Sequence, residues 1–293
     1  MARFIDPRVD WAFKRIFGSE DTKECLITFL NGLFEDELVI KDVTFAKTEK
    51  LGLRPDDRGV VFDVYCITNE GKHVIVEMQK KEQEYFADRA LYYTARAIVQ
   101  QGIRGIWDYH LAPVYTVCFM DFVSQSPILK EFRTDLVLTD LQTRQRVSDR
   151  MRIVYLQLPL FDKHTEAECM DIFDCWIYIV KNMNMFEQMP FSEKYPVFRK
   201  LAEIGDLRKL SREELELYDE DIKNMRDIYA TRKFDEKKGM EIGMAKGMEK
   251  GMAKGMEKEK LATARRLLSM GLSDEQVSTA TELPLEDIQK MKE

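Results

Sequence analysis

Two acidic residues, Asp63 and Glu77, interrupt neighbouring apolar runs of the sequence and together could hold a cation. The runs, residues 60–67 and 73–79, have the β-branched and aromatic composition of strands and flank a turn-like connector, which predicts a hairpin. Directly opposed residues of an antiparallel pair share one face, with Cβ atoms about 5 Å apart. Two carboxylates placed so closely repel each other unless a cation or a shared proton lies between them. Their oxygens, with the amide oxygen of Gln79, suit a hard divalent cation such as magnesium or manganese.

The register of this expected hairpin decides whether the two acids meet. A three-residue loop, residues 69–71 with its glycine in the left-handed conformation, pairs Asp63 with Glu77 and Val61 with Gln79. A two-residue loop would shift the register by one and place the acids on opposite faces, as ordinary solvated strand residues. Aspartate is disfavoured in strands, and both runs are too apolar for a half-solvated sheet. The sequence therefore favours a metal site over solvated acids.

The bulk composition limits the class of protein and its partners. The 293 residues, 45% hydrophobic and 33% charged, allow a well-buried domain with an accessory region. No apolar stretch approaches the roughly 20 residues that span a bilayer, and the first seven residues lack the apolar core of a signal peptide. The five cysteines form no CxxC pair, which indicates buried free thiols in a reducing compartment. We therefore expect a cytoplasmic protein with no membrane partner.

The net charge of −7 restricts any contact with nucleic acid to a local basic patch. A bound metal ion would add positive charge at the point where a phosphate lies, so DNA stays a candidate partner. The three histidines are scattered along the chain, and a zinc site has no support.

The order of the expected elements predicts an α/β layer sandwich with a mixed central sheet flanked by helices. The hairpin lies in the middle of this order, between a helical start and a second helix. The expected elements are a helix over residues 8–34 interrupted at 18–21, a β-rich stretch over 39–48, a polar loop over 53–59, the hairpin, a helix over 85–101, and strands over 113–120 and 152–158.

The sequence after Pro159 changes to a helical and polar character, with a local apolar core around Trp176. Residues 239–258 form five consecutive tetrads, GMEI, GMAK, GMEK, GMAK and GMEK. Glycine in every tetrad makes an isolated helix marginal, so a solvated tether or loose helix is favoured over a specific self-association seam. We expect four parts: an α/β domain over residues 1–160, a helical extension over 161–232, the Gly-Met tract over 233–260, and a small helical module over 261–293.

The closing module reads as short helices broken at residues 270–273 and 282–284, with Ser273 and Gln276 forming a capping box. The pattern is similar to a helix-turn-helix. However, the chain after Lys260 carries six acidic and four basic residues, and a helix that reads DNA is normally more basic. A packing module, with contacts between copies of the chain, is at least as well supported.

Several short motifs occur along the first half of the chain in a characteristic order. They are Asp10-x-x-Phe13-Lys14-x-x-Phe17-Gly18, Phe62-Asp63-Val64, Ile75-Val76-Glu77-Met78-Gln79, Arg89-x-x-x-Tyr93, and Tyr109-x-x-x-Pro113-Val114-Tyr115. This order resembles the Rpn family of recombination-promoting nucleases, PD-(D/E)XK nuclease-like proteins also labelled transposases. The resemblance covers residues 6–122 closely and residues 239–290 in style, whereas residues 123–238 match loosely.

The resemblance implies a restriction-endonuclease-like core, dependence on magnesium or manganese, and DNA phosphodiester cleavage linked to recombination or mobile DNA. It places Asp63 and Glu77 as metal-binding acids, adds the Met78 backbone carbonyl as a ligand, and makes Asp63, Glu77 and Gln79 the catalytic set. Gln79 occupies the position of a lysine in the wider superfamily. A glutamine can orient water or coordinate a cation, but it carries no charge to stabilise the phosphate.

Further candidates keep two interpretations each. Asp10 is an additional candidate metal ligand, or an acid favoured by the dipole of the first helix. Arg89 and Arg96, seven residues apart on nearly one helix face, are candidate DNA-binding residues or solubilising charges. At the level of function, an endonuclease competes with a non-catalytic DNA- or protein-binding module that keeps the fold. The acid pair favours the enzyme, because a purely structural sheet gains nothing from opposed acids.

Overall fold

The computed structural model describes residues 2–35, 37–50 and 60–291. The chain divides into two compact units, Met1–Lys223 and Asn224–Glu293. The long helix α6 (Arg212–Ser269) begins in the first unit and ends in the second. The polar loop expected over residues 53–59 lies outside the described residues.

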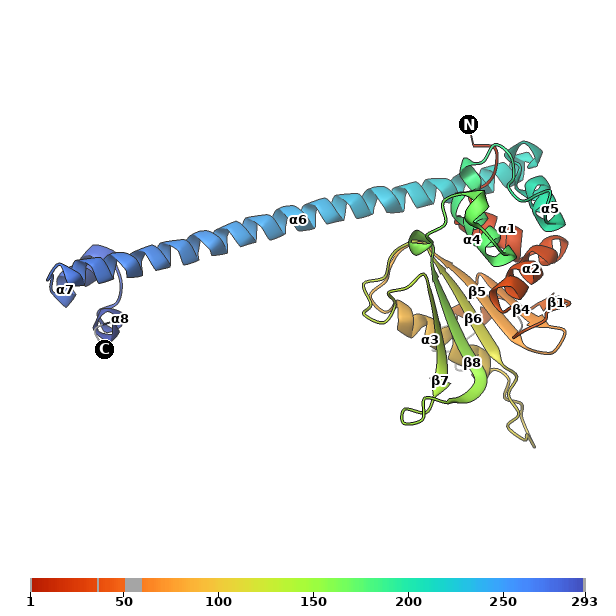
Figure 1. Cartoon of the computed structure of the whole chain (residues 1–293), viewed down its shortest axis with the longest axis horizontal. Coiled ribbons are helices and arrows are strands. Elements are labelled where there is room, and N and C mark those ends of the chain that lie inside the picture. The colour runs from red at the N-terminus through yellow and green to blue at the C-terminus, as the bar shows by residue number, and fades with distance from the viewer. Residues whose placement is uncertain (1, 36, 51–59, 292–293) are drawn as a thin grey trace. The chain divides into compact units, whose positions relative to one another are not determined.

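The first unit is built on a mixed six-stranded sheet in the order β1-β4-β5-β6-β8-β7 (Figure 1). The strands β5, β6 and β8 run parallel to one another, and the pairings of β1 with β4, β4 with β5 and β7 with β8 are antiparallel. A separate two-stranded ladder joins β2 to β3. The strands are β1 (Val43–Phe45), β2 (Glu49–Lys50), β3 (Val60–Val61), β4 (Val64–Thr68), β5 (His73–Gln79), β6 (Val114–Met120), β7 (Arg133–Thr139) and β8 (Arg146–Gln157).

Helices cover both faces of this sheet. Strand β6 shows this, since its successive residues point to opposite sides and are buried on both. Phe119 meets an aromatic cluster on one face, with ring centroids 5.7 Å from Phe13 and 5.0 Å from Phe29. Its neighbours Cys118 and Met120 pack on the other face. The helices are α1 (Asp10–Phe17), α2 (Lys23–Leu33), α3 (Phe86–Val99), α4 (Ile172–Asn182) and α5 (Pro196–Gly205), with short 3-10 turns η1 (Glu20–Thr22), η2 (Leu158–Leu160), η3 (Glu166–Glu168), η4 (Met183–Met185) and η5 (Leu207–Lys209).

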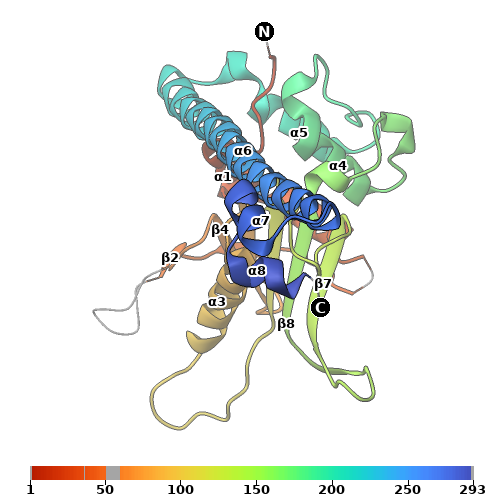
Figure 2. The ribbon, with the colours of Figure 1, turned by 90° about the vertical axis from the view of Figure 1, so that its left-hand side faces the viewer.

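The helical stretch after the sheet completes the first unit and does not form a separate core. Trp176 of α4 is fully buried and lies against Phe17 of α1 and Phe198 of α5, with ring centroids 5.5 and 4.9 Å away. Figure 2 shows α4 and α5 together beside the end of the sheet. Trp176, around which a local core was expected, is therefore buried, but it belongs to the same core as the aromatic cluster of the sheet.

The second unit consists of the later part of α6 with α7 (Asp274–Thr281) and α8 (Leu285–Lys290). Ala264, Val277 and Ile288 form its small buried centre. The expected breaks near residues 270–273 and 282–284 are confirmed, and Ser273 with Gln276 makes the predicted capping box. The Gly-Met tetrads lie inside α6 with their methionine side chains exposed. The finer boundaries at residues 160, 232 and 260 stay predictions.

The predicted α/β sandwich with a mixed sheet and a helical C-terminal region is confirmed. The five cysteines are free and buried, as expected. Two strands lie outside the predicted segments: the short β2, and β7, which pairs with a β8 that begins six residues before the strand predicted from residue 152. Within the described ranges, every helix is either too short or too polar to cross a lipid bilayer.

Candidate active site

The hairpin of β4 and β5 has the register that brings Asp63 and Glu77 together. Val64 lies opposite Val76 at the end of the ladder, and the preceding residue, Asp63, contacts Glu77 and Met78 of β5 through hydrogen bonds. The loop is closed by the Thr68 N–H, which donates to the Lys72 carbonyl at 2.8 Å. Its glycine has a φ of +77°, in the left-handed region. The prediction of a three-residue loop is confirmed.

The predicted pairing of Val61 with Gln79 is wrong. The ladder of β4 begins at Val64, and Val61 belongs to β3, where it lies opposite Glu49 of β2. The chain therefore leaves the hairpin just before Asp63. Asp63 therefore lies just beyond the end of the ladder between β4 and β5.

Three hydrogen bonds hold the acid pair in place. The Asp63 N–H donates to Glu77 Oε1 at 3.2 Å, and the Met78 N–H donates to Asp63 Oδ2 at 2.8 Å. Each carboxylate is thus fixed by the backbone of the opposite strand. The Gln79 side-chain amide donates to Glu77 Oε2 at 3.3 Å, so all three predicted catalytic residues meet at the end of β5. Only 3% of Glu77 is exposed, and the pair lies mostly out of water.

Burial and mutual repulsion disfavour the charged forms of both acids. Burial and then the charge of Asp63 raise the pKa of Glu77, against the hydrogen bond from the Asp63 N–H and the positive charge of Arg89. Burial raises the pKa of Asp63 as well, and the charge of Asp10 adds to this, while the Met78 N–H lowers it. Two buried acids that resist simultaneous ionisation form a place where a cation would be stabilised.

The acid pair fits a divalent cation through its donor set. Asp63 and Glu77 supply carboxylate oxygens, and the Met78 carbonyl and Gln79 amide oxygen are hard donors at the same strand end. In the described portion of the chain, no group of three or more His, Cys, Asp or Glu side chains surrounds one point. Any remaining ligands would be backbone, amide or solvent oxygens, as is usual for magnesium.

Asp10 and Lys14 of α1 lie on the approach to the acid pair as an ion pair of their own. Lys14 Nζ lies 2.8 Å from Asp10 Oδ2, and both side chains are exposed. Burial alone would lower the pKa of Lys14, but the hydrogen bond and charge of Asp10, with the charge of Asp63, raise it. Asp10 acts on Asp63 through its charge and is engaged with Lys14, so its role as a metal ligand stays a prediction.

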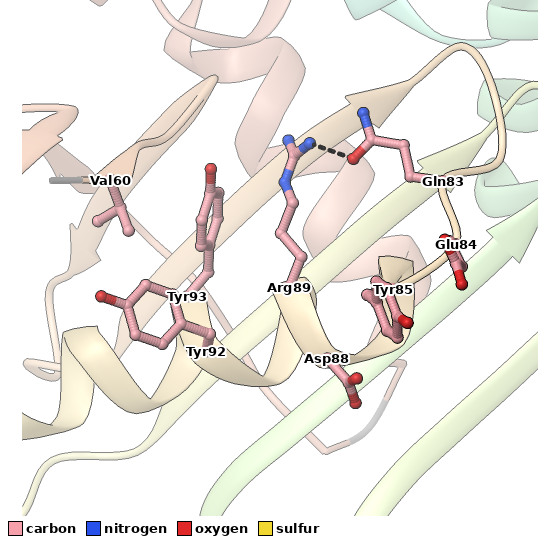
Figure 3. Close-up of a pocket in the computed structure, with 8 residues that line it drawn as sticks. All are labelled: Val60, Gln83, Glu84, Tyr85, Asp88, Arg89, Tyr92 and Tyr93. Carbon is pink, nitrogen blue, oxygen red and sulfur yellow. Dashed lines mark hydrogen bonds between the residues drawn. The ribbon is translucent and has the colours of Figure 1, made fainter. Parts of the chain in front are cut away.

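The two predicted DNA-binding arginines of α3 have different surroundings. Arg89 reaches the acid pair, with Nη2 3.7 Å from Glu77 Oε2, and its Nη1 donates to Gln83 Oε1 at 3.0 Å (Figure 3). Its guanidinium also lies over the ring of Tyr93 at 5.1 Å. Arg96 is buried, with only 6% exposed. The role of Arg89 and Arg96 in DNA binding stays a prediction.

Lys14 has no predicted role, although it lies in the opening motif and its charge lowers the pKa of Asp63. The signal was available as the i, i+4 spacing from Asp10, which places both side chains on one side of α1. The proximity of that side to the hairpin, in contrast, is a tertiary contact that no local pattern reveals.

The comparison with known families agrees with this geometry. A family model described as PD-(D/E)XK nuclease family transposase matches residues 7–233. The match contains the whole sheet, the acid pair and α1 to α5. No curated protein and no solved structure matches the chain. Since the match covers most of the sequence, the chain belongs to the PD-(D/E)XK nuclease family transposases.

Proposed function

We propose that this protein is a divalent-metal-dependent DNA endonuclease that hydrolyses phosphodiester bonds in recombination or in the movement of mobile DNA. The observation that carries the proposal is the placement of Asp63 beside the buried Glu77, with hydrogen bonds between Asp63 and the Glu77–Met78 segment of β5. The family membership supports a nuclease origin for this pair. The five buried free cysteines are consistent with action in the reducing cytoplasm.

Asp63 and Glu77, with the Met78 carbonyl, would hold the cation. When bound, a divalent cation activates water as a nucleophile and stabilises the charge that develops on the phosphate. The hydrogen bonds between each carboxylate and the opposite strand fix both groups before the cation or the substrate arrives. This preorganisation lowers the cost of reorganising the site during the reaction.

The neighbouring side chains would supply the positive charge and the orienting hydrogen bonds that the two acids lack. Gln79 orients Glu77 through its amide and offers an oxygen to water or cation. It brings no charge, so positive charge near the phosphate comes from Arg89, which lies 3.7 Å from Glu77, and from Lys14. Arg89 lies on α3 and Lys14 on α1, and each would exchange part of its present ion pair for the substrate phosphate.

Incubation of the purified full chain with supercoiled plasmid tests the proposal, with magnesium, manganese, calcium or EDTA in parallel. We expect nicked or linear product with magnesium or manganese and none with EDTA. Asp63→Asn and Glu77→Gln should abolish cleavage, because each removes one charged ligand while keeping the side-chain shape. Glu70→Gln, in the exposed loop of the same hairpin, is the matched control and should cut like the wild type.

Circular dichroism of each variant separates loss of chemistry from loss of fold. Cleavage by folded Asp63→Asn or Glu77→Gln at the wild-type rate would contradict the site. A wild-type chain that binds plasmid but cuts it with none of the metals would instead support the non-catalytic binding module.

A further inference from the structure

A groove of about 520 Å³ runs along α3 next to the acid pair (Figure 3). Five of its lining residues come from one side of the helix start, at the i, i+3, i+4, i+7 and i+8 spacing of a single helical face. They are Tyr85, Asp88, Arg89, Tyr92 and Tyr93. The volume lies within the usual 300–1,000 Å³ of sites for small organic groups. The groove is therefore large enough for a nucleotide.

The aromatic side chains of this groove divide into an inner and an outer set. Tyr93 is the inner wall: Arg89 lies over its ring, and Phe62 meets it edge-on at 5.6 Å. Tyr85 and Tyr92 form the outer set and lie on either side of Arg89 in Figure 3. They are 66% and 42% exposed. Large exposed aromatic surface in a concave site is a place where a flat ligand gains by stacking.

Arg89 connects the groove to the candidate active site. Its guanidinium lines the groove and also approaches Glu77 Oε2 at 3.7 Å. A nucleotide whose phosphate lies at the acid pair therefore has its base within reach of the groove. Arg89 stands at the junction, where it can contact the phosphate between them.

The acidic residues of the groove determine which part of a nucleotide it accepts. Glu84 and Asp88 line the outer part and are exposed. Their charges repel a phosphate, but carboxylates accept hydrogen bonds from the exocyclic amino groups of bases, such as N4 of cytosine. The groove thus combines aromatic faces for a base, carboxylates that accept hydrogen bonds from its amino group, and the Arg89 guanidinium at the phosphate end.

We infer that this groove binds one unpaired nucleobase of the DNA strand, with preference for a base that carries an amino group such as cytosine. The substrate is then a single strand, or a duplex end or junction with a splayed nucleotide. A base inside an intact duplex is stacked and paired, and its ring face reaches a tyrosine only after it leaves the stack. The inference rests on the proposed nuclease function, because it names the substrate class of that same site.

Fluorescence anisotropy tests the inference on the full chain carrying Glu77→Gln, in EDTA, so that no cleavage occurs. Four labelled probes of equal length are compared: oligo-dC, oligo-dT, an abasic strand and a blunt duplex. We expect oligo-dC to bind most tightly, oligo-dT less tightly, and the abasic strand weakest of the single strands. Adding Tyr85→Ala or Tyr92→Ala should weaken oligo-dC binding by roughly 5- to 100-fold, the usual range for loss of one base stack.

Two further variants make the test specific. Tyr85→Phe keeps the aromatic face and should retain binding. Asp88→Asn should narrow the difference between oligo-dC and oligo-dT, because a neutral amide also donates to the thymine carbonyl. Leu91→Ala, exposed on the same helix but outside the groove, is the control and should leave all affinities unchanged.

Equal binding of oligo-dC and the abasic strand, or an equal loss for duplex and single strand in the tyrosine variants, would overturn the inference. The plasmid assay keeps the two hypotheses apart. If the wild type cuts plasmid while the groove variants bind every probe normally, only the groove assignment fails. If base-dependent binding is found without cleavage in any metal, the groove stands and the nuclease proposal fails.

Discussion

At the scale of single residues, the site depends on how its one uncharged member, Gln79, is placed. Gln79 is buried, and its side-chain amide donates to Glu77 Oε2. It therefore contacts the acid whose pKa is raised by burial. A lysine at this position would bring a charge to the phosphate, whereas the amide can only orient its neighbours. In the proposed mechanism, Arg89 and Lys14 would therefore supply the positive charge and Gln79 would position Glu77.

Substitutions at Gln79 should therefore change positioning and charge in different ways. We predict that Gln79→Ala slows cleavage roughly 10- to 100-fold, the usual effect of losing a group that orients a metal ligand. Gln79→Lys should preserve or raise the rate if the amine reaches the phosphate, and should raise the magnesium requirement if it lies too close to the cation. Cleavage rates measured across a magnesium titration distinguish these results. Unchanged rate and metal dependence in both variants would make Gln79 a bystander.

A second residue-scale prediction concerns Asp206, which fastens the N-terminal segment to the helical layer. Its buried carboxylate accepts from Arg208 at 2.5 Å and from Arg3 at 3.2 Å. The hydrogen bond and charge of Arg208, with Arg3, lower the pKa of Asp206 well below its usual range. The folded state therefore stabilises the ionised form, and this stabilisation is present above the ordinary aspartate pKa and lost as the pH falls through the folded pKa.

Asp206→Asn should lower the free energy of unfolding by about 1–3 kcal/mol at neutral pH, as for loss of hydrogen bonds to a buried charge. The difference from the wild type should shrink as the pH is lowered below about 4, where the unfolded wild-type residue takes up a proton. Urea unfolding of both proteins at several pH values measures it. A difference that stays constant from neutral to acidic pH would show that the charge of Asp206 contributes nothing.

At the scale of elements, the active-site geometry depends on a three-residue loop that needs one left-handed residue. Gly71 supplies it, with a φ of +77°, and a Cβ built there meets no atom within 4 Å. A side chain at this position would therefore destabilise the protein through the strained backbone conformation and not through a steric clash. The loop fixes the register, and the register fixes the distance between the two acids.

Gly71→Ala should reduce the free energy of unfolding by about 1–2 kcal/mol, the cost of the left-handed conformation for an L-residue. Gly71→Asn should cost less, because asparagine tolerates this region. Gly251→Ala is a matched control with the opposite expected sign, since Gly251 lies inside α6 with open space around its Cα and alanine is the better helix former. Thermal unfolding followed by circular dichroism compares the three. Equal stability of Gly71→Ala and the wild type would contradict the loop argument.

The secondary-structure elements differ in how well they can be predicted from the sequence. The hairpin register was predictable, because turn chemistry and the position of the apolar runs act locally. The strand β7 was not, because it begins with polar residues such as Arg133 and Asp135, and Asp135 forms ion pairs with Arg133 and with Arg152 of β8. Its stability comes from pairing at the sheet edge, which local sequence does not encode.

The candidate site divides in the same way. Asp63, Glu77 and Gln79 were identified because they share one hairpin, and the structure brings them together. The surroundings of Arg89 and Arg96 were not predictable from their seven-residue spacing. That spacing gives a common helix face, but it does not tell which part of the face is covered by the rest of the protein. The pairing of Val61 with a distant strand was missed for the same reason.

At the scale of the whole molecule, the two units differ in the features that could bind DNA. The first contains the sheet, the acid pair and the groove, and the family match ends at residue 233. After Lys260 the second unit carries more acids than bases, which disfavours contact with phosphate. We therefore assign DNA binding mainly to the first unit, and contacts between copies of the chain stay the candidate role of the helical C-terminal region.

A chain that ends at Arg232 should retain most of the DNA affinity and cleavage per folded molecule. Anisotropy with a labelled oligonucleotide and the plasmid assay measure both, and light scattering monitors the oligomeric state. If the shortened chain loses DNA binding while its oligomeric state equals that of the full chain, the closing helices contribute a DNA-reading module. If binding and assembly are lost together, the C-terminal region acts through association of copies.

The distribution of the cysteines gives the molecule a built-in chemical reporter. All five are buried free thiols in the first unit, on α2, β4, β6, α4 and the segment before it. A thiol reagent in solution reacts with such a group only when the surrounding structure opens, so the labelling rate measures the opening equilibrium at that point. Mass spectrometry of the modified chain would then measure local opening of the sheet and of its helices separately, with the native cysteines as the labelling sites. Cys118 lies beside Glu77 in the β5–β6 ladder, and its labelling would follow the opening of the active site itself.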